Sequence, residues 1–402
     1  MSFTRNHRYP SVKKRFAIWA ALFSVGTLAM PSTALASNER ESLTTDSERY
    51  FKSEDIFNLE YVSEVQVSPN GKYVAYVRRS NDIMSDSSRA NVWLASVDGK
   101  SHRPLLSSKK SYYSIRWSPD GSRLAYLSNE EGKPQLYVRW MDTGQTAIVT
   151  NVTSNPSNIT WSPDGKHIAF TMSVDAKEKP LDIKMPKKPD GAKWSPSFQY
   201  ITKARYQADG RGILEPAYTH IFIVPADGGT ARQLTSGNYH HNGRLSFSPD
   251  SDKIYFSANR SDNWEYEPVE GDIFSVDMMG NIAQLTNDKG LESSPVVSPD
   301  GKHIAYARRD DEKVMYKNSY LYVMKSDGTD AQNLTKDIDN SVSNFHWKDN
   351  KHVYFQQSVR GLAQVDVVSL SGSVKAVAKG LGGTTLGRPY VFGTYHAVDD
   401  VV

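Results

Sequence analysis

The chain has 402 residues, of which 38% are hydrophobic and 23% charged, which is enough ordinary globular sequence for one large domain. Its first 36 residues contain five basic and no acidic residues, so removing their charge from the formal total of +3 leaves −2 for the rest. A slightly acidic body argues against a nucleic-acid partner, which needs a basic stripe. The absence of cysteine excludes disulfides, thiol nucleophiles and thiolate metal sites.

The N-terminus has the three parts of a secretory signal. Basic residues between Arg5 and Arg15 precede the apolar stretch Phe16–Met30, which is short for a membrane span, and Ala34-Leu35-Ala36 is a small-residue cleavage site. We therefore predict a signal peptide over residues 1–36 and a periplasmic or secreted mature protein without a membrane span. The alternative is an uncleaved membrane anchor.

After a polar strap over residues 37–61, one ten-residue pattern keeps returning. Its clearest copy is Trp161–Phe170, which contains Ser162-Pro163-Asp164-Gly165. Ser at the first position, Pro at the second and Gly at the fourth favour a type I turn. A short β-rich run follows each turn, so two strands joined by a tight turn form the unit. Similar units stand at Val67–Tyr76, Trp117–Tyr126, Phe247–Phe256 and Val297–Tyr306, with a degenerate one at Trp347–Phe355.

Each unit has a second half, in which a short strand, a turn and a closing strand ending near Leu-Thr follow one another. Four short strands per repeat are typical of a β-propeller blade. The pattern predicts six complete blades, with outer limits near Val62 and Ala378, in an all-β propeller domain over residues 62–402. Unrelated hairpins with shared turn residues would not give this long two-part period.

Blade three carries an insertion at about residues 172–218. It is rich in lysine and proline, and its Trp194-Ser195-Pro196 lacks the Asp-Gly and the β-rich run of a true repeat. Long loops in compact domains are functional or disordered. A binding role and a solvated basic loop both remain open.

The last residues predict a seventh blade that is cut short. Arg388–Phe392 resembles a first strand, and His396–Val402 resembles the following turn and the opening of a second strand. Because an unclosed propeller leaves exposed strand edges, we expect the chain to be a fragment of a longer protein.

These features resemble the N-terminal propeller of the prolyl oligopeptidase family of serine peptidases, in its acylaminoacyl-peptidase and dipeptidyl-peptidase branch. The resemblance covers about Glu54 to Val402, and its more specific parts are Arg205–Gly210 and His220–Gly229. It implies a propeller that limits access to a C-terminal α/β-hydrolase domain and favours short peptides. That domain, with its catalytic Ser, Asp and His, is absent from the 402 residues, so the resemblance assigns no catalytic residue to this chain.

The residues present offer little chemistry of their own. A hydrolase nucleophile elbow needs Gly-x-Ser-x-Gly. Gly99-Lys100-Ser101 lacks the second glycine, and it also lacks the glycine spacing and the helix of a phosphate-binding loop. We interpret it as a surface turn. The repeated Trp117, Trp161 and Trp347 are expected to pack between blades.

Two further groups contain residue types that can bind ligands. His240-His241 invites a metal, but adjacent strand residues face opposite sides and no acidic cluster accompanies them. We expect neither a metal nor a cofactor. Glu265, Glu267 and Glu270, with Trp264, form an acidic aromatic loop that could bind the N-terminal amine of a peptide. The alternative is a solvated loop between strands.

The main hypothesis is the gating propeller of an exported serine peptidase that acts on short peptides, with this chain inactive alone. The rival is a free-standing periplasmic propeller that binds other proteins as a scaffold, as Tol-type proteins do.

Overall fold

The computed structural model describes residues 50–176, 186–195, 200–311, 314, 316–382 and 393–402. Within these residues the strands form six four-stranded antiparallel sheets and one short two-stranded sheet. The first three blades are β1 (Glu60–Val67), β2 (Tyr73–Asp82), β3 (Ser87–Ser96) and β4 (His102–Leu106); β5 (Tyr112–Trp117), β6 (Arg123–Ser128), β7 (Gln135–Trp140) and β8 (Thr146–Ile148); and β9 (Ser157–Trp161), β10 (His167–Asp175), β13 (Ala217–Pro225) and β14 (Arg232–Gln233).

The other three blades follow the same order of strands. They are β15 (Ser246–Phe247), β16 (Lys253–Ala258), β17 (Asp272–Asp277) and β18 (Ile282–Gln284); β19 (Leu291–Val297), β20 (His303–Arg309), β21 (Tyr320–Lys325) and β22 (Gln332–Asn333); and β23 (Ser343–Trp347), β24 (His352–Val359), β25 (Leu362–Ser369) and β26 (Val374–Leu381). The predicted all-β propeller with six blades is confirmed.

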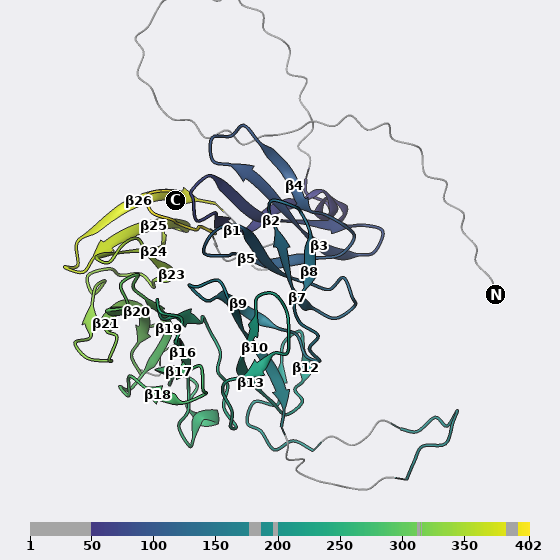
Figure 1. Ribbon diagram of the computed structural model, residues 1–402. Coiled ribbons are helices and arrows are strands. Elements are labelled where there is room, and N and C mark those ends of the chain that lie inside the picture. The colour runs from purple at the N-terminus through teal and green to yellow at the C-terminus, as the bar shows by residue number, and fades with distance from the viewer. Residues whose placement is uncertain (1–49, 177–185, 196–199, 312–313, 315, 383–392) are drawn as a thin grey trace, which may run out of the picture. The chain divides into compact units, whose positions relative to one another are not determined.

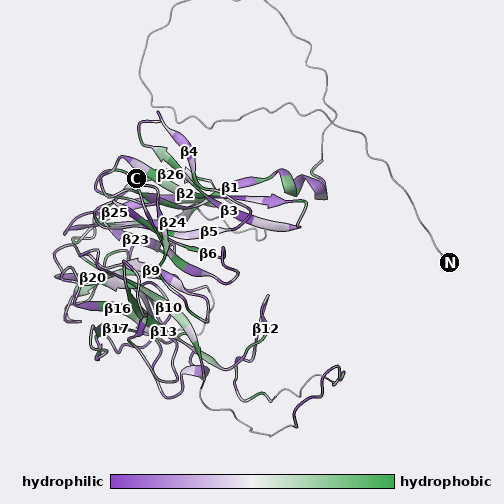
Figure 2. Cartoon of the chain, turned by 45° about the vertical axis from the view of Figure 1, so that its right-hand side comes forward, coloured by the Kyte–Doolittle hydropathy of each residue, from purple (hydrophilic) through white to green (hydrophobic). Residues whose placement is uncertain are grey.

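The first strand of each blade lies on the inner side of the arrangement and the fourth on the outer side (Figure 1). First strands of successive blades contact one another, as β1 does β5 and β19 does β23. The strands are largely apolar and the turns polar (Figure 2). Most of the hydrophobic core lies between blades, because a single sheet cannot bury both of its faces. Phe170 and Phe222 of blade three, for example, share a cluster with Leu136 of blade two.

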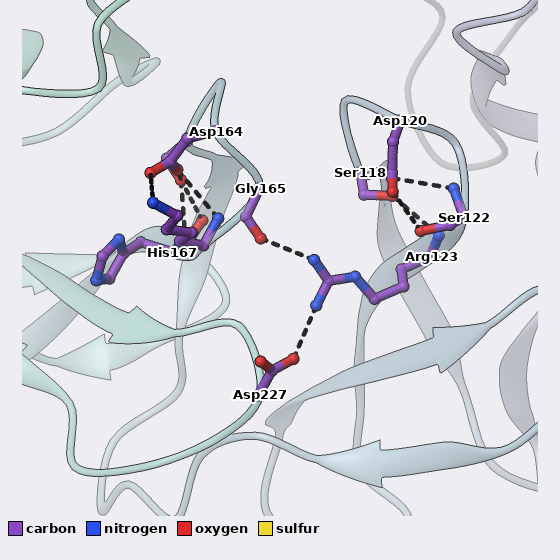
Figure 3. Close-up of polar contacts among 10 residues, drawn as sticks. Ser118, Asp120, Ser122, Arg123, Asp164, Gly165, His167 and Asp227 are labelled. Carbon is purple, nitrogen blue, oxygen red and sulfur yellow. Dashed lines mark hydrogen bonds and ion pairs between the residues drawn. The ribbon is translucent and has the colours of Figure 1, made fainter.

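The Ser-Pro-Asp-Gly segments form the tight turns that the sequence predicts (Figure 3). In blade two, Ser118 Oγ donates to Asp120 Oδ1 at 2.5 Å and accepts from the Arg123 amide at 2.9 Å. The Gly121 amide closes the turn on Ser118 O at 2.9 Å. Gly121 has a φ of 71°, which explains why glycine suits that position. The hydrogen bonds that Asp120 accepts from the Ser118 and Ser122 hydroxyls lower its pKa to about 2.

Neighbouring blades are joined by the tryptophans that end the first strands. The Nε1 groups of Trp117, Trp161 and Trp347 donate to carbonyl oxygens of the preceding blade, those of Gln66, Arg116 and Val296. The predicted packing role is confirmed. Arg123 adds a second contact between blades two and three. Its guanidinium lies over the Trp161 ring. It also donates to Gly165 O and Asp227 (Figure 3).

A β-bulge interrupts the first strand in five of the six described blades. The bulged residues have left-handed φ values between 45° and 58° and are Glu64, Ser114, Asn158, Ser294 and Asn344. A bulge adds one residue to a strand and turns the neighbouring side chains. The sequence pattern did not reveal these bulges, and they decide which side chains of the first strands face the axis.

Connections between second and third strands lie on one face of the propeller, opposite the Ser-Pro-Asp-Gly turns. In blade three this connection is the long excursion between β10 and β13, which contains the hairpin β11 (Gln207–Ala208) and β12 (Gly212–Ile213). In blade four it contains the 3-10 helix η2 (Trp264–Tyr266). A second 3-10 helix, η1 (Ser53–Asn58), precedes β1, and no helix among the described residues is long and apolar enough to cross a membrane.

The segment 393–402 lies between the first strands of blades six and one. Tyr395 donates its hydroxyl to Asn344 O, and the Val67 amide donates to His396 Nδ1 at 3.2 Å. The expected turn after His396 is present, closed by the bridge between Val398 and Val401, but within the described residues it does not continue into a paired second strand. The predicted strand Arg388–Phe392, the signal peptide and residues 37–49 of the strap lie outside the described residues.

Candidate functional site

The acidic loop, Asn263–Glu270, joins β16 to β17 and contains η2. Its neighbours on the same face are the insertion of blade three and the connection between β20 and β21 of blade five. Two hollows flank the loop. One of about 350 Å³ is lined by Glu265 and residues 204–207, and the other, of about 570 Å³, borders blade five. The loop therefore lies between the blade-three insertion and blade five.

Trp264 anchors the loop to blade three. Its ring packs edge-on against His240 and Tyr218, with centroids 5.3 and 6.3 Å away. His240 Nδ1 accepts from the Thr219 amide at 3.3 Å, and burial lowers the pKa of His240. The predicted ligand-binding tryptophan is thus a packing residue in this structure.

Glu265 is neutralised by the insertion. Its carboxylate is paired with Lys203 and accepts from the Ala204 amide at 3.3 Å. The hydrogen bond to Glu265 is the main cause that raises the pKa of Lys203. The described part of the insertion is therefore tied to the acidic loop, and Glu265 has little free charge for a ligand.

Glu267 and Glu270 line the larger hollow. Glu267 accepts from Ser261 Oγ at 2.9 Å, and Glu270 accepts from the Gly290 amide at 3.3 Å. Within the described residues neither carboxylate has a basic side chain within salt-bridge distance. Of the three predicted glutamates, these two keep a charge that a cation could use.

The same hollow contains two basic residues that the sequence analysis did not single out, Lys289 and Arg309. Neither forms a salt bridge in the part of the chain that the structure describes. Tyr266, whose ring is 77% exposed, forms part of the same wall. The hollow is large enough for a short peptide and is lined by both acidic and basic side chains. This combination suits a ligand that carries a positive and a negative charge.

A buried acidic pair lies behind the loop. Glu292 is 1% exposed and its carboxylate lies 3.3 Å from Arg308 Nη1, which also pairs with Asp288. Burial raises the pKa of Glu292 to about 7. Burial, with the nearby charge of Glu270, raises the pKa of Asp272 to about 6. The charge state of this region therefore changes near neutral pH.

The two adjacent histidines serve separate purposes. His241 is buried, its Nδ1 lies 3.1 Å from Thr219 O, and its Nε2 lies 2.7 Å from Arg260 Nη1. The imidazole is thus a neutral ring that donates through Nδ1, and burial lowers its pKa to about 3. His240 instead contacts Trp264. The described residues contain no group of three side chains arranged to hold a metal ion.

The Gly99-Lys100-Ser101 segment forms the exposed turn between β3 and β4. The Gly99 amide donates to Ser96 O at 3.0 Å, and Gly99 has a φ of 75°. A strained strand-to-helix elbow is therefore not found there, in agreement with the interpretation from sequence.

Two protein-family models match parts of the chain. The TolB beta propeller domain matches residues 71–215, and the dipeptidyl peptidase IV (DPP IV) N-terminal region matches residues 192–306, which include the acidic loop.

Curated relatives include several peptidases. Dipeptidyl-peptidase 5 of Porphyromonas gingivalis is 24% identical over 384 residues, covering 92% of this chain and 54% of the relative. The uncharacterized peptidase YuxL of Bacillus subtilis is 30% identical over 208 residues, 52% of this chain and 31% of the relative. The Tol-Pal system protein TolB of Pseudomonas aeruginosa is 30% identical over 137 residues, covering 34% of this chain and 30% of the relative. The chain therefore spans about half or less of the length of these proteins.

Solved structures share the fold. Acylaminoacyl peptidase of Pyrococcus horikoshii superposes with a TM-score of 0.62 at 17% identity, covering 81% of this chain and 47% of that one. The propeller domain of the Trilobed protease of Pyrococcus furiosus gives 0.54 at 17% identity, with 80% and 84% covered. The predicted resemblance is confirmed: the chain is a propeller like those of dipeptidyl-peptidase and acylaminoacyl-peptidase proteins.

Proposed function

We propose that the chain is the substrate-selecting propeller of a serine peptidase that cleaves short peptides. The catalytic Ser, Asp and His would belong to a hydrolase domain outside these 402 residues, since the sequence contains no Gly-x-Ser-x-Gly elbow. The observation that carries the proposal is the larger hollow beside the acidic loop, with Glu267 and Glu270 facing the same space as Lys289 and Arg309.

The chemistry of this hollow suits the end of a short peptide. A carboxylate and an ammonium form a charge-assisted hydrogen bond that is roughly twice as strong as a neutral one. Glu270 and Glu267 would receive the N-terminal amine, and Arg309 and Lys289 would face a carboxylate of the same or a neighbouring residue. A long chain without a nearby terminus would lack the amine, so the loop would favour short peptides.

Replacing Glu270 by glutamine is expected to weaken binding of a free-amine dipeptide amide about tenfold, because one charge-assisted contact is lost. N-acetylation of the peptide removes the amine from both Glu267 and Glu270, so it should cost at least as much, and its cost should be smaller in Glu270→Gln than in wild type. Calorimetric titration of the four combinations measures the coupling.

Two controls separate this contact from the general charge of the loop. Asp262→Asn removes an exposed negative charge beside the loop and should leave binding unchanged, and Glu265→Gln should have a smaller effect because Lys203 already pairs with that carboxylate. Equal losses in all three variants, or equal binding of the acetylated peptide, would refute the assignment.

We also propose that the protein acts after export, in the periplasm or outside the cell. The support is the basic, apolar and small-residue succession within residues 1–36. The native protein should then begin at Ser37. N-terminal sequencing that starts at Met1 would contradict export by cleavage.

A further inference from the structure

Basic side chains gather where the first strands of the blades approach the axis. They are Arg116 on β5, Arg244 just before β15, His346 on β23 and His396 in the segment 393–402. Arg244 Nη1 donates to Phe345 O at 2.6 Å, so this side chain of blade four reaches a strand of blade six, past the intervening blade five. Such a contact requires the guanidinium to extend across the axis.

The other basic residues of the cluster lie close to Arg244. The rings of His346 and His396 are 5.3 Å apart. Burial lowers the pKa of Arg244, His346 and His396, and the nearby charge of Arg116 lowers it further in each case. Four half-buried basic residues from three blades and the segment 393–402 therefore lie near one another close to the axis, and we call them the axial cluster.

Among the described residues, no carboxylate pairs with either arginine of the axial cluster. Each arginine donates to one backbone carbonyl, Arg116 to Ile115 O at 2.7 Å and Arg244 to Phe345 O. Neither has a carboxylate within salt-bridge distance in the part of the chain that the structure describes. Burial lowers the pKa of Arg116, and the nearby charge of Glu64 partly opposes this effect. The Glu64 carboxylate already lies 3.5 Å from Arg79 and accepts a hydrogen bond from the Ser114 amide.

The histidines add hydrogen-bond donors rather than charge. Burial and the nearby arginines lower the pKa of His396 to about 4 and that of His346 well below its usual value, so both rings are neutral at pH 7. His396 Nδ1 accepts from the Val67 amide, which leaves the proton of the neutral ring on Nε2. Burial also lowers the pKa of Arg244, to about 10, which leaves it charged at neutral pH.

We propose that the axial cluster binds an oxyanion, a carboxylate or a phosphate, between Arg116 and Arg244. A half-buried cation without an acidic partner is unfavourable, and an oxyanion supplies the missing partner. Guanidinium groups match the planar oxygens of a carboxylate or phosphate and can bind two of them at once. A peptide carboxylate passing along the axis and free phosphate are the two sources of this chemistry.

The test titrates the purified chain at low salt with two probes, tri-aspartate peptide and inorganic phosphate, by calorimetry. Arg116→Gln and Arg244→Gln should each weaken binding about tenfold or more. Arg232→Gln is the matched control, because it removes one exposed positive charge on β14, away from the axis, and it should leave binding within about twofold. Tighter binding of tri-aspartate than of phosphate identifies a peptide carboxylate as the ligand, and the reverse identifies phosphate.

Thermal unfolding provides a second readout that does not require tight binding. Addition of the bound anion should raise the melting temperature of the wild-type chain and of Arg232→Gln, and the Arg116→Gln/Arg244→Gln double variant should lose that increase. Without anion the double variant should unfold in one transition close to that of wild type, because both arginines are half-buried and neither pairs with a carboxylate among the described residues. Two results would overturn the proposal. In one, the wild-type chain binds neither probe at millimolar concentration. In the other, Arg232→Gln loses as much affinity for the anion as the Arg116→Gln and Arg244→Gln variants do. Neither measurement depends on peptidase activity, so failure here would leave the proposed function standing.

Discussion

Replacing Phe170 by alanine is expected to lower the free energy of unfolding by about 3–5 kcal/mol. Phe170 is fully buried and stacks on Phe222, with ring centroids 5.6 Å apart. Its cluster contains side chains of both blades two and three. The lost stability has two parts: the transfer free energy of the ring, and the free-energy cost of a cavity that the two neighbouring sheets cannot close.

Denaturant unfolding followed by tryptophan fluorescence and by circular dichroism measures this change. Phe170→Leu keeps most of the volume and should cost less than about 1.5 kcal/mol. Tyr266→Ala removes an aromatic ring that is 77% exposed and should change stability by less than about 0.5 kcal/mol. If Phe170→Ala lowered the free energy of unfolding as little as Tyr266→Ala, the hydrophobic core between the blades would not stabilise the propeller in the way described.

The second large effect is a dependence of stability on pH that originates in Glu292. Its pKa is about 7 in the folded protein against an ordinary 4.5, so the folded state binds the proton more tightly than the unfolded state. Its contribution to stability is therefore fully present below pH 4.5 and is lost as pH rises through 7. Above that pH a buried carboxylate with one unpartnered oxygen opposes folding.

Glu292→Gln should remove this dependence, because the amide resembles the protonated acid at every pH. Its stability relative to wild type should rise by about 2–3 kcal/mol between pH 5 and pH 8.5. Groups outside this acidic region contribute equally to both proteins, so the difference reports Glu292 together with the carboxyls whose charges act on it, Asp272 and Asp288. Glu131→Gln, which removes an exposed charge, should show no such trend, and a flat difference for Glu292→Gln would contradict the account.

The repeat could be predicted because its chemistry is local. Ser118, Asp120 and Gly121 form their turn within a few residues, and Trp117 and Trp161 occupy the same place in successive blades. A pattern of this kind is visible in the sequence without knowledge of the fold.

The site was predicted only in part, because its pairings connect distant segments. Glu265 pairs with Lys203, 62 positions earlier, and nothing in either local sequence indicates this contact. Lys289 and Arg309 reach the hollow from the next blade. The glutamates were thus found as a group, but which of them is available for a ligand depends on the fold.

The axial cluster was missed for a related reason. The bulges in the first strands shift the alternation of side chains, so a period of two does not show which residues face the axis. Arg244 precedes its strand, whereas Arg116 and His346 lie within theirs.

We propose above all that this propeller serves a serine hydrolase domain outside the 402 residues. The most direct test captures the native protein from its cells with an antibody against the propeller, labels it with a fluorophosphonate and locates the labelled peptide by mass spectrometry. The account predicts one labelled serine in a Gly-x-Ser-x-Gly segment outside these residues, and no labelling of the purified 402-residue chain. A native polypeptide that stays unlabelled, or a label on a serine within the propeller, would contradict it.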